Sequence, residues 1–108
     1  MSTTLPEGWS STWSDADATL TIVMPPMPLT GGFEVERVRV GPLLLDLSLR
    51  RRHATLQVRI RHRQGRTGTL CLVLPPPGPG LVEVDGVQLR GSEVRFPFSG
   101  DHEVVGYY

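Results

Sequence analysis

The chain has 108 residues, and its eleven acidic and eleven basic side chains leave no formal net charge at pH 7. This length suits one domain with a modest core, and it excludes a large catalytic barrel or a doubly wound sheet. The balanced charge gives no global attraction to nucleic acid or to a membrane surface. All eleven basic residues are arginine, and the single cysteine, Cys71, excludes an internal disulfide bond.

The first eighteen residues show no sustained apolar period, and we expect an irregular N-terminal segment over 1–18. Within it, only the stretch from Asp15 to Ala18 is compatible with a helical turn. The segment lacks the basic start and apolar run of a signal peptide, and no apolar run approaches the roughly 20 residues of a membrane span. We therefore expect a soluble, cytoplasmic protein, or a domain cut from a larger one.

The rest of the chain alternates with period two, which is typical of half-buried β-strands. The leucines at 43, 45, 47 and 49 share one face, and Leu56, Val58, Ile60 and His62 share another. The polar residues 51–55 predict a hairpin link between these two runs. Further strands are predicted over 19–24, 33–40, 69–74, 81–84, 87–90, 93–99 and 103–108, with Pro- and Gly-rich breaks between several of them.

The pair Asp85-Gly86 separates two of these short runs by two residues. A type I′ hairpin turn needs positive φ at both central positions, which aspartate tolerates and glycine adopts freely. A metal ligand at Asp85 would need further ligands at suitable spacing, and the sequence offers none. We therefore predict a hairpin turn here.

Eight or nine short strands with one apolar face each must bury those faces against a second layer. The predicted fold class is all-β, an antiparallel β-sandwich of the jelly-roll or immunoglobulin-like kind that forms a single domain over 1–108.

An arginine-rich hairpin over 50–66 is the most distinctive feature of the sequence. Its strands are expected to carry a basic strip on one sheet face, and the candidate residues are Arg50, Arg52, Arg59, Arg61 and Arg63. Such a strip could bind a polyanion or an acidic protein surface. The alternative is a solvated outer face on which the arginines pair with Glu34, Glu36 and Asp46.

Three aromatic residues are candidates for contact with a sugar, because exposed rings can stack on pyranose faces. These residues are Trp9, Trp13 and Tyr108. The alternative is that the tryptophans cover an open end of the sandwich and that the C-terminal tyrosines pack across strands.

The titratable residues show no arrangement typical of catalysis. The histidines His53, His62 and His102 lack metal-ligand spacing, and we expect no metal and no cofactor. Ser99, Asp101 and His102 suggest a catalytic triad, but three neighbours in one turn cannot readily adopt relay geometry. Cys71 lies in an apolar run and is expected to be an inert, packed thiol. The sequence thus predicts no enzyme.

Four stretches carry a resemblance to a known class of domain: LPEGW at 5–9, VERVRVGPLLLDLSLRRR at 35–52, VEVDGVQL at 82–89 and FPFSGDHEVVGYY at 96–108. Their order resembles the C-terminal β-sandwich domain that follows the (α/α)6 barrel in amylo-α-1,6-glucosidase-like, glucoamylase-like and α-L-rhamnosidase-like glycoside hydrolases. The resemblance implies an accessory domain without catalytic residues, because in those enzymes the general acid and base lie in the barrel.

Two functional hypotheses follow. The first is a non-catalytic accessory or binding domain that contacts carbohydrate or packs against a catalytic domain. The second is an interaction module that uses the arginine-rich hairpin to bind an acidic protein or a polyanion, with nucleic acid the less favoured partner. An exposed sheet edge is also compatible with a homodimer.

Overall fold

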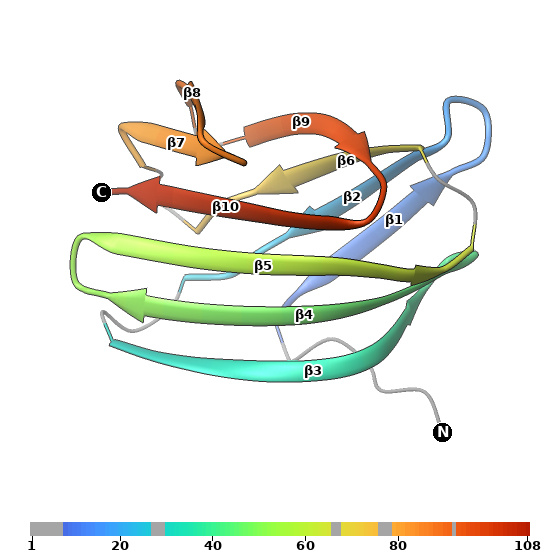
Figure 1. The fold of residues 1–108 in the computed structure, drawn as a ribbon, viewed down its shortest axis with the longest axis horizontal. Coiled ribbons are helices and arrows are strands. Elements are labelled where there is room, and N and C mark those ends of the chain that lie inside the picture. Colours follow the sequence, from blue (N-terminus) through green and yellow to red (C-terminus); the bar gives the residue numbers. More distant parts are fainter. Residues whose placement is uncertain (1–7, 27–29, 66–67, 76–78, 92) are drawn as a thin grey trace.

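The computed structural model describes residues 8–26, 30–65, 68–75, 79–91 and 93–108 (Figure 1). These residues form ten β-strands: β1 (Ser10–Ser14), β2 (Thr19–Val23), β3 (Thr30–Val40), β4 (Leu43–Arg52), β5 (Thr55–Gln64), β6 (Gly68–Val73), β7 (Leu81–Val84), β8 (Val87–Leu89), β9 (Glu93–Phe98) and β10 (Asp101–Tyr107). The described residues contain no helix, so none that could cross a membrane. The predicted all-β class is confirmed.

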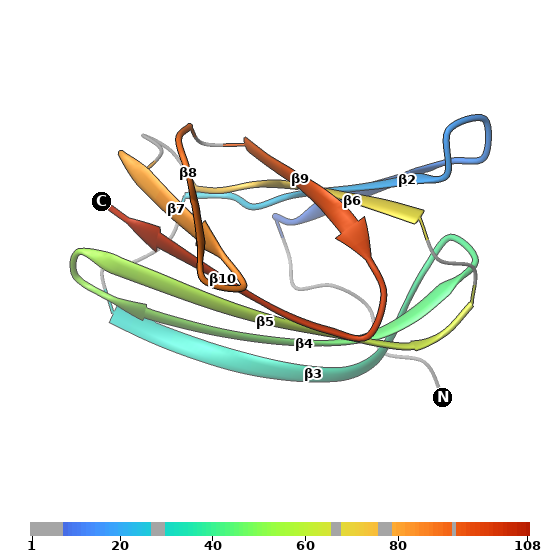
Figure 2. The same ribbon diagram turned by 45° about the horizontal axis from the view of Figure 1, so that its top comes forward.

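Two sheets pack face to face, as Figure 2 shows from the side. The smaller sheet has the order β1-β2-β6-β9, and the larger sheet has the order β3-β4-β5-β10-β7-β8. Strands β2 and β6 pair in parallel, whereas the other pairs are antiparallel. Because β2 and β6 are neighbours although β3, β4 and β5 separate them in sequence, the chain leaves the smaller sheet, forms three of the six strands of the larger one, and returns.

The core between the sheets consists of the residues that the period-two pattern assigns to the inner faces. The leucines at 43, 45, 47 and 49 of β4 are at most 5% exposed, as are Leu56, Val58 and Ile60 of β5. Leu20, Ile22, Leu70, Leu72, Val94 and Phe98 cover them from the smaller sheet. The alternation therefore predicted these faces correctly.

Irregular structure is expected over 1–18; residues 1–7 lie outside the described part of the chain, and residues 8–18 differ from the expectation. Residues Ser10–Ser14 form β1 and pair with β2, and Trp13 lies opposite the buried Leu20. Asp15 to Ala18 form a tight turn instead of a helical one, and Ala18 has a φ of 51°. A polar strand forms here because Trp13 anchors it against the core.

The link between β4 and β5 is shorter than the sequence suggested. Both strands extend to leave only His53 and Ala54 in the turn, with His53 at a φ of 40°. Arg51, expected in a polar link, is instead a strand residue with 8% of its surface exposed.

The Asp85-Gly86 pair forms the predicted two-residue turn between β7 and β8. Asp85 has a φ of 50° and Gly86 a φ of 87°, so both central positions have the positive φ that a type I′ turn requires.

Candidate functional site

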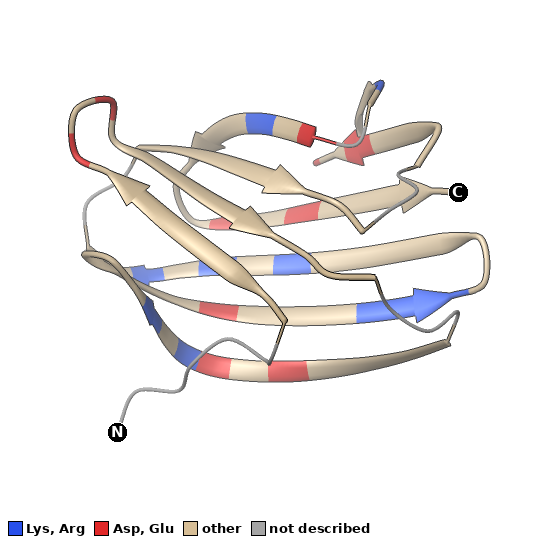
Figure 3. Cartoon of the chain, turned by 180° about the vertical axis from the view of Figure 1, so that it is seen from behind, with Lys and Arg blue, Asp and Glu red and all other residues tan. Residues whose placement is uncertain are grey.

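Charged residues concentrate on the larger sheet, as Figure 3 shows by colour, whereas β1, β2 and β6 carry none. The outer side chains of β3, β4, β5 and β10, together with Asp85 at the end of β7, form a surface that we call the charged face. Its polar and charged members are Glu34, Glu36, Arg39, Asp46, Ser48, Arg50, Arg52, Gln57, Arg59, Arg61, Arg63, Asp85, Asp101 and Glu103.

All five arginines of the predicted strip lie on this face. Arg50 and Arg52 come from β4, and Arg59, Arg61 and Arg63 from β5. They point outward because the leucines, valines and isoleucine that alternate with them point into the core.

The three arginines of β5 each pair with an acid, so the strip is not uniformly basic. Arg59 Nε lies 3.0 Å from Glu103 Oε2, and Arg61 Nε lies 3.1 Å from Asp101 Oδ1. The register of β5 with β10 sets both pairs, because Arg61 is directly opposite Asp101 and Arg59 opposite Glu103. Sequence reasoning missed these two acids, since alternation does not say which strand lies beside β5.

Asp46 on β4 is the partner of the third arginine, Arg63. It also accepts a hydrogen bond from a β-bulge in β3. The pairing of β3 with β4 shifts between Val35 and Val38, and Arg37 in this bulge has a φ of 55°. The backbone N–H of Arg37 donates to Asp46 Oδ1 at 2.9 Å. Partial burial raises the pKa of Asp46, but this N–H bond and Arg63 outweigh burial and leave the pKa lowered. Asp46 is therefore ionised at neutral pH.

Five charges of the charged face form no ion pair with any described residue. They are Glu34, Glu36 and Arg39 on β3, and Arg50 and Arg52 on β4. Arg50 faces Gly32 on one side and Gln57 on the other, so no neighbouring acid lies directly opposite it. These five side chains are the charges of the face that remain available to a partner.

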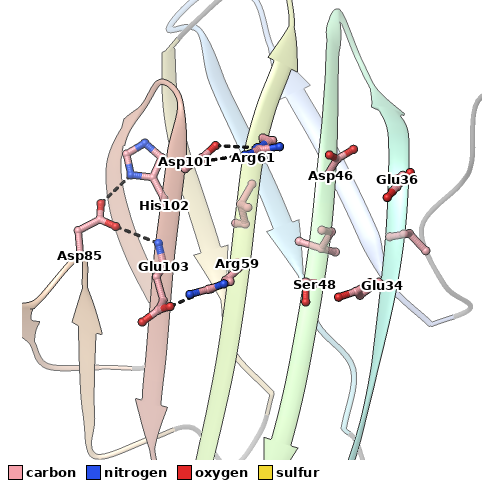
Figure 4. A pocket seen from close by; sticks show the side chains of 13 residues that line it. Glu34, Glu36, Asp46, Ser48, Arg59, Arg61, Asp85, Asp101, His102 and Glu103 are labelled. Carbon is pink, nitrogen blue, oxygen red and sulfur yellow. Dashed lines mark hydrogen bonds and ion pairs between the residues drawn. The ribbon is translucent and has the colours of Figure 1, made fainter.

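The charged face is hollowed into two adjoining depressions. The first has a volume of about 530 Å³ and runs from Glu34 and Glu36 across Arg59 and Arg61 to His102 (Figure 4). The second, of about 770 Å³, lies around Gly31, Gly32 and Arg50. Glu34, Ser48 and Arg59 line both, so the two form one continuous groove.

His102 closes one end of the groove and pairs with Asp85, as Figure 4 shows. Its Nδ1 lies 2.7 Å from Asp85 Oδ2, and its Nε2 accepts a hydrogen bond of 3.1 Å from the Ser99 backbone N–H. In this arrangement Nδ1 donates to Asp85 and Nε2 accepts from the backbone. The acid partner is thus Asp85, not Asp101, and the Ser99 contact is through its backbone. Because both ring nitrogens are engaged, His102 has no lone pair free to take a proton from a nucleophile.

Two carboxyl groups of the groove, those of Asp46 and Asp85, are poorly suited to act as general acids. A general acid at neutral pH needs a raised pKa. Asp46 and Asp85 have lowered pKa values instead. For Asp85, burial acts to raise the pKa, but hydrogen bonds from the Glu103 N–H and from His102 outweigh it. Both carboxylates are thus fixed negative charges of the groove at neutral pH.

The three aromatic candidates for sugar contact do not lie on one surface. Trp9 packs edge-on against Phe33, with ring centroids 5.4 Å apart. Trp13 packs so closely against Gly41 that a methyl group there would lie 2.7 Å from Trp13 Cβ, and its indole N–H donates to Asp15. Both tryptophans are half-buried against the core, and neither lines the groove.

Tyr108 packs near the β4–β5 turn, where it contacts Ala54 and Pro75. Its hydroxyl donates to the Pro75 carbonyl at 3.0 Å, and its backbone N–H donates to the Ala54 carbonyl. The Arg51 guanidinium lies 4.0 Å from the centre of its ring, a cation–π contact. Burial raises the pKa of the Tyr108 hydroxyl. The ring thus covers a buried arginine.

The remaining candidates are dispersed. His53 lies in the β4–β5 turn, and His62 packs edge-on against Phe98. Cys71 is 2% exposed, and its thiol donates to Glu93 Oε1 at 3.2 Å. Burial and then Glu93 raise the pKa of this thiol. No group of three metal-ligating side chains comes together among the residues that the structure describes.

No protein-family model matches the chain, and no curated protein is detectably similar to it in sequence.

Proposed function

We propose that this chain is a non-catalytic binding module that contacts a partner protein through the charged face. The observation that carries the proposal is the continuous groove on this face, which is lined by two unpaired acids, Glu34 and Glu36, and by the unpaired Arg50. Paired charges on a surface contribute little affinity, whereas charges without a partner can select one by complementarity.

The arrangement of the unpaired charges defines the expected partner. Glu34 and Glu36 attract a basic group, and Arg50 and Arg52 attract an acidic one. Arg50 can also bind a carboxylate through two N–H groups. We therefore expect a protein segment of mixed charge, with acidic and basic residues a few positions apart.

A polyanion is a weaker candidate, because Arg59, Arg61 and Arg63 already have acidic partners. Carbohydrate stacking is weaker as well, because Trp9, Trp13 and Tyr108 pack against the body of the protein and line neither depression. The resemblance to accessory domains of glycoside hydrolases is consistent with a non-catalytic module but adds no sugar-binding residue.

Selection from a phage-displayed random peptide library tests the proposal. We expect enriched peptides of mixed charge whose binding weakens at least tenfold in an Arg50→Ser/Glu34→Gln variant. The matched control is Arg95→Ser, which removes an arginine from the smaller sheet, and it should leave binding unchanged.

Three outcomes would contradict the proposal. One is that no peptide is enriched, and another is that binding survives the double variant or is lost equally in Arg95→Ser. The third is a sugar that binds on a glycan array and is lost in Trp13→Ala, which would favour stacking.

A further inference from the structure

The larger sheet extends beyond the smaller one at β8. Val87 lies opposite Val84, and Leu89 lies opposite Val82, so all four side chains are on the inner face of the sheet. Val82 and Val84 are buried, but Val87 is 62% exposed and Leu89 is 38% exposed. Four strands do not cover the inner face of six, and two apolar side chains remain in water.

The β8 strand also has a free backbone edge. Among the described strands it pairs only with β7, and all three of its residues are exposed. Natural sheets usually protect such edges with charge, proline or a bulge. The edge strand β3 has charged residues and the bulge at 35–38, and the edge strand β9 has Glu93, Arg95 and Pro97. Strand β8 has none of these.

The sequence of β8 is complementary to itself. If two copies pair antiparallel about Gln88, Val87 of each copy lies opposite Leu89 of the other, on one face. On the opposite face the two Gln88 amides meet, and each amide can both donate and accept. The same register places Arg90 opposite Gly86 of the other copy, one residue from Asp85, so the charges at the ends are complementary as well.

From these features we propose that β8 joins β8 of a second copy of this chain in an isologous, antiparallel contact that continues the larger sheet across a two-fold axis. A stable dimer usually buries about 800 Å² on each partner, and a three-residue edge supplies only part of that. The contact is therefore weak and dependent on concentration. It does not involve the charged face, which stays open in both copies.

Analytical ultracentrifugation between about 10 and 500 µM tests the association, because a weak dimer forms only in the upper part of such a range. The weight-average mass should rise from 11.9 kDa toward twice that value. Gln88→Lys places two positive charges together at the axis and should keep the protein monomeric, as should Gln88→Glu. Mixing the two variants should restore the dimer.

Val23→Lys is the matched control, since Val23 is 37% exposed but lies on β2 of the smaller sheet. It should dimerise like the wild type, and circular dichroism should show that every variant is folded. As a second test, Gln88→Cys in a Cys71→Ser background should form an intermolecular disulfide under mild oxidation, because directly opposite Cα atoms lie about 4.5–5.5 Å apart.

A monomeric mass at 500 µM, together with a Gln88→Cys variant that fails to cross-link, would overturn the proposal. So would equal loss of the dimer in Val23→Lys, or a failure of the Lys and Glu variants to associate when mixed.

Discussion

Replacing Asp85 with asparagine removes a charge from the β7–β8 turn but keeps a side chain that tolerates positive φ. The carboxylate accepts a bond of 2.9 Å from the Glu103 N–H and one of 2.7 Å from His102 Nδ1. A hydrogen bond to a charged group contributes about 1.5–3 kcal/mol. Because the Asp85 side chain is 45% exposed and the asparagine oxygen still accepts one bond, we expect a net loss of about 1 kcal/mol.

The predicted loss depends on pH, since the pKa of Asp85 is lowered in the folded state. A carboxyl group of this kind stabilises the fold above its unfolded pKa, and the contribution disappears as the pH falls through the folded pKa. The Asp85→Asn variant should therefore be less stable than the wild type at pH 7. The difference should shrink once the pH falls below the ordinary value of 3.8.

Urea denaturation followed by circular dichroism measures the free energy of unfolding between pH 7 and pH 2.5. At pH 7 a loss of about 1 kcal/mol corresponds to a Tm about 4 °C lower for a domain of this size. Asp101→Asn is the control, because Asp101 is 66% exposed and pairs only with an exposed arginine, and it should cost less than about 0.5 kcal/mol. Equal stability of Asp85→Asn and wild type at pH 7, or a difference that is constant with pH, would refute the reasoning.

Three further predictions concern the core and its margins. Leu47→Ala, at a site 1% exposed, should lower the free energy of unfolding by about 2–5 kcal/mol, and a loss below 1 kcal/mol in the same urea assay would contradict the packing described. Cys71 should react with a thiol reagent at pH 8 on the order of a hundredfold more slowly in the folded than in the urea-unfolded chain, because burial disfavours the thiolate; equal rates would show that the thiol is accessible. Arg51→Met should leave stability within about 1 kcal/mol or raise it, because the buried Arg51 Nε has no partner among the described residues; a loss above 3 kcal/mol in thermal denaturation would show that the guanidinium is required.

The sequence predicted which residues of each strand face the core, because burial of one face imposes a period of two. The leucines of β4 and the inner residues of β5 follow from this rule alone. The period-two rule did not predict β1, because Ser10–Ser14 is polar and is held against the core by one side chain, Trp13. Tertiary contact here overrides a weak local pattern.

The sequence predicted which arginines lie on the charged face, but not which acids pair with them. The outward direction of Arg59 and Arg61 follows from alternation, but their partners Glu103 and Asp101 are 44 and 40 residues away. Strand order, not periodicity, brings β10 beside β5, and period two does not encode strand order. A strip that looks basic in sequence is therefore balanced in space.

The charged face and the β8 edge, the two surfaces proposed to bind, both arise because the larger sheet has six strands and the smaller one four. The larger sheet presents an outer face wide enough for a groove that crosses several strands. The same excess of strands leaves Val87 and Leu89 of β8 without cover from the smaller sheet. If β8 pairs with a second copy, the two grooves become parts of one continuous sheet, related by the two-fold axis. A partner with two mixed-charge segments would then bind the dimer more tightly than the monomer, and Gln88→Lys should remove that gain while leaving the affinity for a single segment unchanged.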